Sequence, residues 1–168
     1  MNAWYAIWTR SHCERLVAQQ LAARGFAPFL PEVRVRSRRV RVVQRIPMPM
    51  FPGYLFVRDA LDKGRYIEML KVRGIVRVLA DGWTRLTPIP DGEIEALQRV
   101  IEASVDVDPY PHLQHGDRVR VVEGPLSGVE GIFIQDRQHK GRLVLSVDLL
   151  GRSVAVEVDE TAVTCAAA

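Results

Sequence analysis

The sequence has few cysteines and no metal-binding pattern, which excludes several classes of protein. Its two cysteines, Cys13 and Cys165, stand near opposite ends of the 168 residues and form no C-x-x-C pair. They support neither a disulfide framework nor a zinc site. The four histidines show no metal-ligand spacing either, so we expect no metal and no cofactor.

Long apolar runs are also missing. The longest ones fall far short of the roughly 18 residues that predict a membrane span. The first ten residues, "MNAWYAIWTR", lack the basic region and long apolar core of a signal peptide. We therefore expect a cytoplasmic protein, with no membrane contact, that acts as a monomer.

Motifs that assemble a catalytic site are absent as well. The sequence contains no G-x-S-x-G, H-E-x-x-H or D-x-D-x-D-G, and "GPLSGVEG" (124–131) lacks the Lys-Ser/Thr pair of a phosphate-binding loop. An enzyme that uses Cys13 with a histidine is nearly excluded, because we expect Cys13 in the first turn of a helix with no defined base. We predict no catalytic residues and no enzymatic activity.

Positive charge, in contrast, is abundant in the first part of the chain. Residues 1–101 carry 17 Lys/Arg against 9 Asp/Glu, whereas residues 112–168 carry 6 against 8. Arginine accounts for 20 of the 23 basic residues, which suits bidentate phosphate contacts, although a codon bias would give the same count. Six of these arginines fall within residues 34–45, where they either contact nucleic acid or keep a solvated hairpin soluble.

The pattern over residues 1–104 predicts an α+β sandwich, with helices on an antiparallel sheet. A strand at "WYAIW" (4–8) precedes a helix over 11–25, with Ser11 as N-cap, Glu14 completing a capping box and Gly25 at its end. The apolar residues change parity at 37–39, which predicts an inserted basic β-hairpin. Further segments predict a short helix within 60–71, a strand over 72–80 and a helix over 91–103.

The second half of the chain predicts a different architecture. Residues 105–114 are acidic and contain prolines, which is typical of a linker. Residues 115–168 then read as short strands, at 117–123, 129–135, 142–150 and 153–158, joined by glycine-containing turns. This pattern predicts a small SH3-like β-barrel.

Three strands of the first domain are apolar on both faces. In "WYAIW", "GYLFV" (53–57) and "IVRVL" (75–79), residues of both parities are apolar. A sheet covered by helices on one side needs one apolar face, so the second face must be covered too. The cover could be the basic hairpin, the barrel or another protein.

The order of these motifs resembles the NusG family. The similarity rests on the "WY" start, "FPGYLFV" (51–57), "VRGIVRVL" (72–79) and "HGDRVRVVEGPLSGVEGIF" (115–133), and it covers essentially the whole chain. It implies an N-terminal NGN domain at 1–104, a linker at 105–114 and a KOW domain at 115–168. It also implies a transcription elongation factor whose NGN domain docks on the clamp helices of the largest RNA polymerase subunit.

The resemblance further implies which residues make contacts. Those expected to face the polymerase are Trp8, Phe51, Pro52, Tyr54, Ile75 and Leu79. Those expected near nucleic acid, including the non-template DNA strand, are Trp4, Arg10, Arg15, Arg38, Arg39 and Arg73. In the first barrel turn, Leu126 and Val129 stand where the family has phenylalanines that help contact the Rho terminator or a ribosomal protein.

This turn departs from the housekeeping pattern, which favours a specialised, operon-specific (RfaH-like) paralogue. Two alternatives stay open at this point. One is a housekeeping factor acting in elongation and Rho-dependent termination, and the other is a general RNA- or ribosome-binding protein with a KOW barrel.

Overall fold

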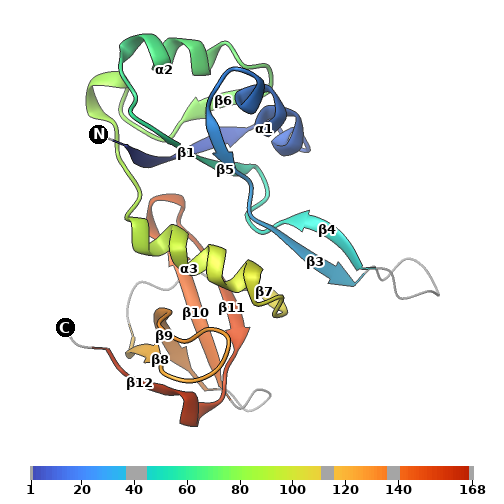
Figure 1. Ribbon diagram of the computed structural model, residues 1–168, viewed down its shortest axis with the longest axis vertical. Helices are drawn as coiled ribbons and strands as arrows, with labels where there is room; N and C mark the ends of the chain where they lie inside the picture. Colours follow the sequence, from blue (N-terminus) through green and yellow to red (C-terminus); the bar gives the residue numbers. More distant parts are fainter. Residues whose placement is uncertain (1, 37–44, 111–115, 136–140, 167–168) are drawn as a thin grey trace. The chain divides into compact units, whose positions relative to one another are not determined.

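The chain forms two compact units in the computed structural model, which describes residues 2–36, 45–110, 116–135 and 141–166 (Figure 1). The first unit comprises Met1–Glu32 with Phe51–Asp91, and the second comprises Val33–Met50 with Gly92–Ala168. This division by packing assigns the 33–50 and 92–104 segments to the second unit. The domain limits of 1–104 and 115–168 therefore stay a prediction.

An antiparallel sheet with strand order β2-β5-β1-β6 organises the first unit. Its strands are β1 (Ala3–Thr9), β2 (Ala27–Phe29), β5 (Tyr54–Asp59) and β6 (Ile75–Val78). β1 is central and pairs along most of its length with β5, from Ala3 opposite Asp59 to Trp8 opposite Tyr54. The strand predicted at 4–8 is confirmed, and the strand predicted over 72–80 is present but shorter, at Ile75–Val78.

Helices α1 (Glu14–Ala23) and α2 (Lys63–Leu70) cover one face of this sheet (Figure 1). Alternate strand residues meet the apolar sides of both helices there, as the period of two in the strands requires. The buried residues of this core are Tyr5, Ile7, Val17, Leu21, Phe26, Leu55, Val57, Met69, Val72 and Val78.

The opposite face of the sheet carries aromatic rings. Phe29 lies edge-on to Trp4, with ring centroids 6.0 Å apart, and stacks on Phe56 at 6.2 Å. Phe51 meets Phe56 edge-on at 6.4 Å. Phe56 is fully buried and Trp4 almost so, so the prediction that both faces are covered is confirmed for β1 and β5.

Helix α1 begins later than the sequence predicts. The expected start at Ser11 is wrong, because His12 has a φ of 61° and the helix starts at Glu14 after Cys13, which makes no side-chain cap. Its end is as expected. Gly25 has a φ of 80°, its N–H donates to the Ala22 carbonyl and the next N–H, of Phe26, donates to Leu21, which is a Schellman motif.

The second unit contains the predicted hairpin strands, a helix and a β-rich part. β3 (Glu32–Arg36) pairs with β4 (Arg45–Pro49) (Figure 1). The predicted reversal at 37–39 lies outside the described residues. Short 3₁₀ turns also occur, at η1 (Trp83–Arg85) in the first unit and at η2 (Asp148–Leu150) and η3 (Glu160–Ala162) in the second.

The β-rich part is a sheet with strand order β12-β8-β9-β10-β11-β7, antiparallel throughout. Its strands are β7 (Val107–Tyr110), β8 (Arg118–Val121), β9 (Glu130–Ile134), β10 (Arg142–Val147), β11 (Arg152–Glu157) and β12 (Val163–Cys165). β9 and β10 approach closely at Gly131, where an added Cβ would lie 2.6 Å from the Val144 carbonyl oxygen. A larger residue there would push the two strands apart.

Strand β7 lies within the segment that the sequence indicated as a linker. It pairs with β11, with Val107 opposite Val156 and Tyr110 opposite Ser153. Pro109 has no N–H to donate, and it is tolerated because β7 is at the edge of the sheet.

Helix α3 (Asp91–Glu102) confirms the helix predicted over 91–103. Ile94, Leu97 and Val100 are buried, and the Arg99 guanidinium donates to the Ser127 carbonyl at 2.6 Å. Near the start of the helix, Oε2 of Glu93 is buried with no hydrogen-bond partner among the described residues. Burial raises the pKa of Glu93 to about 7, with a further contribution from the Asp148 carboxylate that Arg118 partly offsets.

The raised pKa predicts a pH-dependent stability. Because the folded pKa lies above the ordinary value of 4.5, the folded state retains the proton as pH rises from about 4.5 to 7, and stability is lost over that window. We expect Glu93→Gln to be more stable than the wild type at pH 8 by about 1 kcal/mol, a figure reduced for solvent screening. At pH 4.5 this advantage should disappear.

Urea unfolding of both proteins at several pH values measures the difference. A stability difference that stays constant between pH 4.5 and 8 would contradict the raised pKa.

Candidate functional site

Two loops converge on the end of β1 in the first unit. The Thr9 N–H donates to the Gly53 carbonyl, and the Arg10 N–H donates to the Gly74 carbonyl, both at 2.8 Å. These bonds continue the backbone pairing of β1 beyond its own sheet neighbours. They hold the 51–54 turn and the 72–75 loop on either side of the strand end.

The 51–54 turn is built by the Pro-Gly pair of "FPGY". The Tyr54 N–H donates to the Phe51 carbonyl at 3.0 Å, and Gly53 has a φ of 87°. A proline followed by a residue with positive φ is the arrangement of a type II turn, which explains the glycine. Gly53 lies against Trp8, since an added Cβ would be 3.7 Å from Cδ1 of that indole.

The Glu14 carboxylate reaches this turn from helix α1. Its Oε1 accepts the Gly53 N–H at 2.8 Å, and the residue is buried, with 6% of its surface exposed. The sequence predicted a capping box for Glu14, and this is wrong because its carboxylate is bonded across the fold. A glutamate three residues after Ser11 carries no indication of that distant partner.

Exposed side chains gather beside the turn. Trp8 is 41% exposed and lies directly across from Tyr54 on β5 and from Arg77 on β6. The Arg77 guanidinium lies 5.8 Å from the centroid of the Trp8 ring. Such a cation–π contact leaves the indole accessible while restricting its rotation.

A β-bulge extends this exposed region along β6. The pairing shifts so that Thr9 faces Ile75 while Trp8 faces Arg77, which leaves Val76 as the extra residue. Ile75 and Val78 pack on the helix-covered core, whereas Val76 is 45% exposed. We refer to Trp8, Pro52, Tyr54, Val76 and Arg77 together as the docking surface, after the role that we propose for them.

Metal and membrane sites find no support in the described part of the chain. No group of three His, Cys, Asp or Glu residues there could hold a metal ion. Among the same residues, no helix is long and apolar enough to cross a membrane.

Comparisons with known proteins decide the family. A family model described as "Transcription termination factor nusG" matches residues 2–98. The chain belongs to the NusG family. The NusG of Vibrio vulnificus, a transcription termination/antitermination protein, is 30% identical over 93% of this chain and 91% of its own length. Its counterpart from Pseudomonas aeruginosa is 27% identical over 93% of this chain and 94% of its own.

A solved structure agrees on the fold. A structure titled "Domain interaction in Thermotoga maritima NusG" superposes with a TM-score of 0.60 at 20% identity. The superposition covers 99% of this chain and 98% of that one. The resemblance and the predicted fold class, an NGN α+β sandwich followed by a small KOW barrel, are thus confirmed. This chain is a transcription termination/antitermination factor of the NusG family and not an enzyme.

The structure divides the residues expected to face the polymerase into exposed and buried ones. Trp8 and Pro52 are exposed and Tyr54 is half-buried. Phe51 is 3% exposed, because it packs on Phe56. Leu79 is buried too, and Ile75 is half-buried against the helix-covered core. The sequence analysis did not indicate Val76 and Arg77. Both are exposed on β6, where the β-bulge shifts the pairing with β1.

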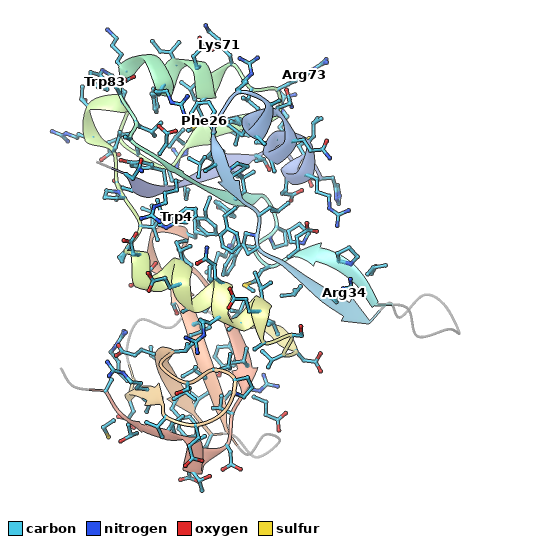
Figure 2. The ribbon with its side chains drawn as sticks, in the orientation of Figure 1. Trp4, Phe26, Arg34, Lys71, Arg73 and Trp83 are labelled. Carbon is cyan, nitrogen blue, oxygen red and sulfur yellow. The ribbon has the colours of Figure 1, made fainter. Side chains whose placement is uncertain are left out.

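The residues expected near nucleic acid do not form one cluster. Arg10 and Arg73 are exposed next to the 72–75 loop, whereas Trp4 is buried with Arg58 over its ring. Figure 2 shows Trp4 and Arg73 well apart. Arg15 bonds Glu32 at 2.5 Å. Both Arg38 and Arg39 lie outside the described residues.

In the NusG barrel, the predicted partner-binding residues lie inside. Leu126 and Val129 are each 4% exposed, in a turn closed by the Gly128 N–H on the Val121 carbonyl at 2.8 Å. Among the described residues of this part, Val122 and Leu149 are the larger exposed apolar ones. Alternation could have indicated Val122, since its neighbour Val121 faces the barrel interior.

Proposed function

We propose that this NusG-family protein is an elongation and antitermination factor that binds RNA polymerase through the docking surface. The observation that supports it best is the half-exposed Trp8, placed between Tyr54 and Arg77 on a bonded strand end. A large aromatic side chain on a rigid backbone loses little conformational entropy on binding, which is typical of an interface hot spot.

The clamp helices of the largest polymerase subunit are the partner that the family resemblance implies. Trp8 and Val76 offer apolar area, and Arg77 adds a positive charge at the same place. An amphipathic helix with an apolar ridge and an acidic flank is complementary to this combination.

Nucleic acid and a second protein complete the proposal. Arg10 and Arg73 are exposed near the docking surface and would contact the phosphates of the non-template strand, which a steep loss of affinity with rising salt would test. The KOW barrel would recruit a second partner, Rho or a ribosomal protein, with Val122 and Leu149 as its exposed apolar contacts. Such a factor works in the cytoplasm and as a monomer.

The polymerase contact is tested by comparing two tryptophans. Trp8 and Trp83 are both 41% exposed, but Trp83 belongs to η1 and not to the docking surface. We expect Trp8→Ala to weaken binding to core RNA polymerase at least about tenfold, as for a hot-spot aromatic, and Trp83→Ala to change it by less than about twofold. Fluorescence anisotropy of labelled protein titrated with polymerase measures both.

Phe51 is not substituted in this experiment, because it is buried and its truncation would destabilise the fold. Urea unfolding of the two tryptophan variants serves as the folding control. Equal polymerase affinities for Trp8→Ala, Trp83→Ala and the wild type would reject the docking surface. A wild-type protein that binds RNA but not polymerase would favour a general RNA-binding protein.

We further propose that the factor acts on particular operons. The support is the barrel turn "GPLSGVEG", in which Leu126 and Val129 stand at the two positions where the family resemblance implies phenylalanines. We expect chromatin immunoprecipitation to find the protein on a few operons. Occupancy that follows RNA polymerase across most transcribed genes would instead identify the housekeeping role.

A further inference from the structure

Glu14 has a place in the fold that neither the family match nor the proposed contacts explain. It is the first residue of α1 and lies 39 positions before its partner Gly53. With 6% of its surface exposed, it is among the few buried charged residues of the described chain. Burying a carboxylate is costly unless hydrogen bonds compensate for the lost water.

The bond to Gly53 completes a two-sided attachment of the turn. The Gly53 carbonyl accepts from the Thr9 backbone at 2.8 Å, and the Gly53 N–H donates to Glu14 at the same distance. The turn is thereby attached to β1 on one side and to α1 on the other. Because Gly53 lies against the Trp8 indole, its placement bounds one side of the space that Trp8 occupies.

We propose that Glu14 is a positioning residue for the docking surface: its carboxylate holds the 51–54 turn so that Pro52 and Tyr54 stand beside Trp8. The inference rests on the proposed function, since it assigns Glu14 a role in polymerase binding without contact to the polymerase. Glu14 acts through its hydrogen bond to Gly53 and not through its negative charge.

A charge role is the natural alternative. A carboxylate in the first turn of a helix is stabilised by the helix dipole whatever else it contacts. The two roles respond oppositely to conservative changes. Glu14→Gln keeps the length and an acceptor oxygen but removes the charge, whereas Glu14→Asp keeps the charge but is one methylene too short to reach Gly53.

The experiment uses the full chain and two readouts. The first is amide hydrogen exchange at Gly53, followed by NMR in the free protein. The second is the affinity for core RNA polymerase. In Glu14→Asp and Glu14→Ala we expect exchange at Gly53 to be about tenfold faster and polymerase affinity about tenfold lower, as for loss of one hydrogen bond. Glu14→Gln should stay within about twofold of the wild type in both.

Asp59→Ala serves as the matched control for general destabilisation. Asp59 is another buried carboxylate, 8% exposed, and it bonds Arg65 at the opposite end of β5, with Nε to Oδ1 at 3.3 Å. We expect Asp59→Ala to lower stability while leaving exchange at Gly53 and polymerase affinity near wild type.

Three results would overturn the inference. They are wild-type behaviour of Glu14→Asp, loss of binding in Glu14→Gln, and an equal loss of affinity in Asp59→Ala. Failure of the proposed function is distinguishable, because Trp8→Ala would then bind polymerase normally. In that case the Gly53 exchange rates of the Asp and Gln variants alone decide whether Glu14 holds the turn.

Discussion

The backbone of Gly53 is bonded at both of its polar groups, and in our proposal the arrangement of the docking surface depends on those two bonds. Thr9 and Glu14 reach the same residue from the end of β1 and the start of α1. A loop attached in this way behaves as part of the sheet, so the aromatic residues beside it can be exposed without becoming mobile. The second loop adds to this, since Gly74 accepts the Arg10 N–H and lies so close to α1 that an added Cβ would be 3.0 Å from Val17.

One face of the sheet changes from core to surface along its length. Trp4 and Ala6 are buried, and Trp8, the next residue of the same parity on β1, is 41% exposed. The aromatic contacts of Phe29, Phe51 and Phe56 stabilise the buried part, while the bulge in β6 leaves Val76 exposed. In our proposal the same strands supply both packing energy and a binding surface, which would explain why they are apolar on both parities.

Local patterns predicted most of the elements, because helix and strand periodicity depend on neighbours in the sequence. They failed where a residue distant in the sequence determines what a side chain bonds or whether it is buried. A glutamate after Ser11 fits a capping box equally well, and only the fold brings Gly53 to it. Alternation indicated that the strand containing Trp8 is apolar on both faces, and the family resemblance pointed to Phe51, but neither showed where burial ends. The proline at position 109 concealed the edge strand β7, which pairing with β11 stabilises.

Photo-crosslinking tests the central claim most directly. Val76 is 45% exposed and belongs to the docking surface. A benzoylphenylalanine in its place would probe that surface while leaving Trp8 and Tyr54 unchanged. The account predicts a crosslink from position 76 to the largest subunit of RNA polymerase, and none from position 83. A crosslink to that subunit from position 83 and not from position 76 would contradict it.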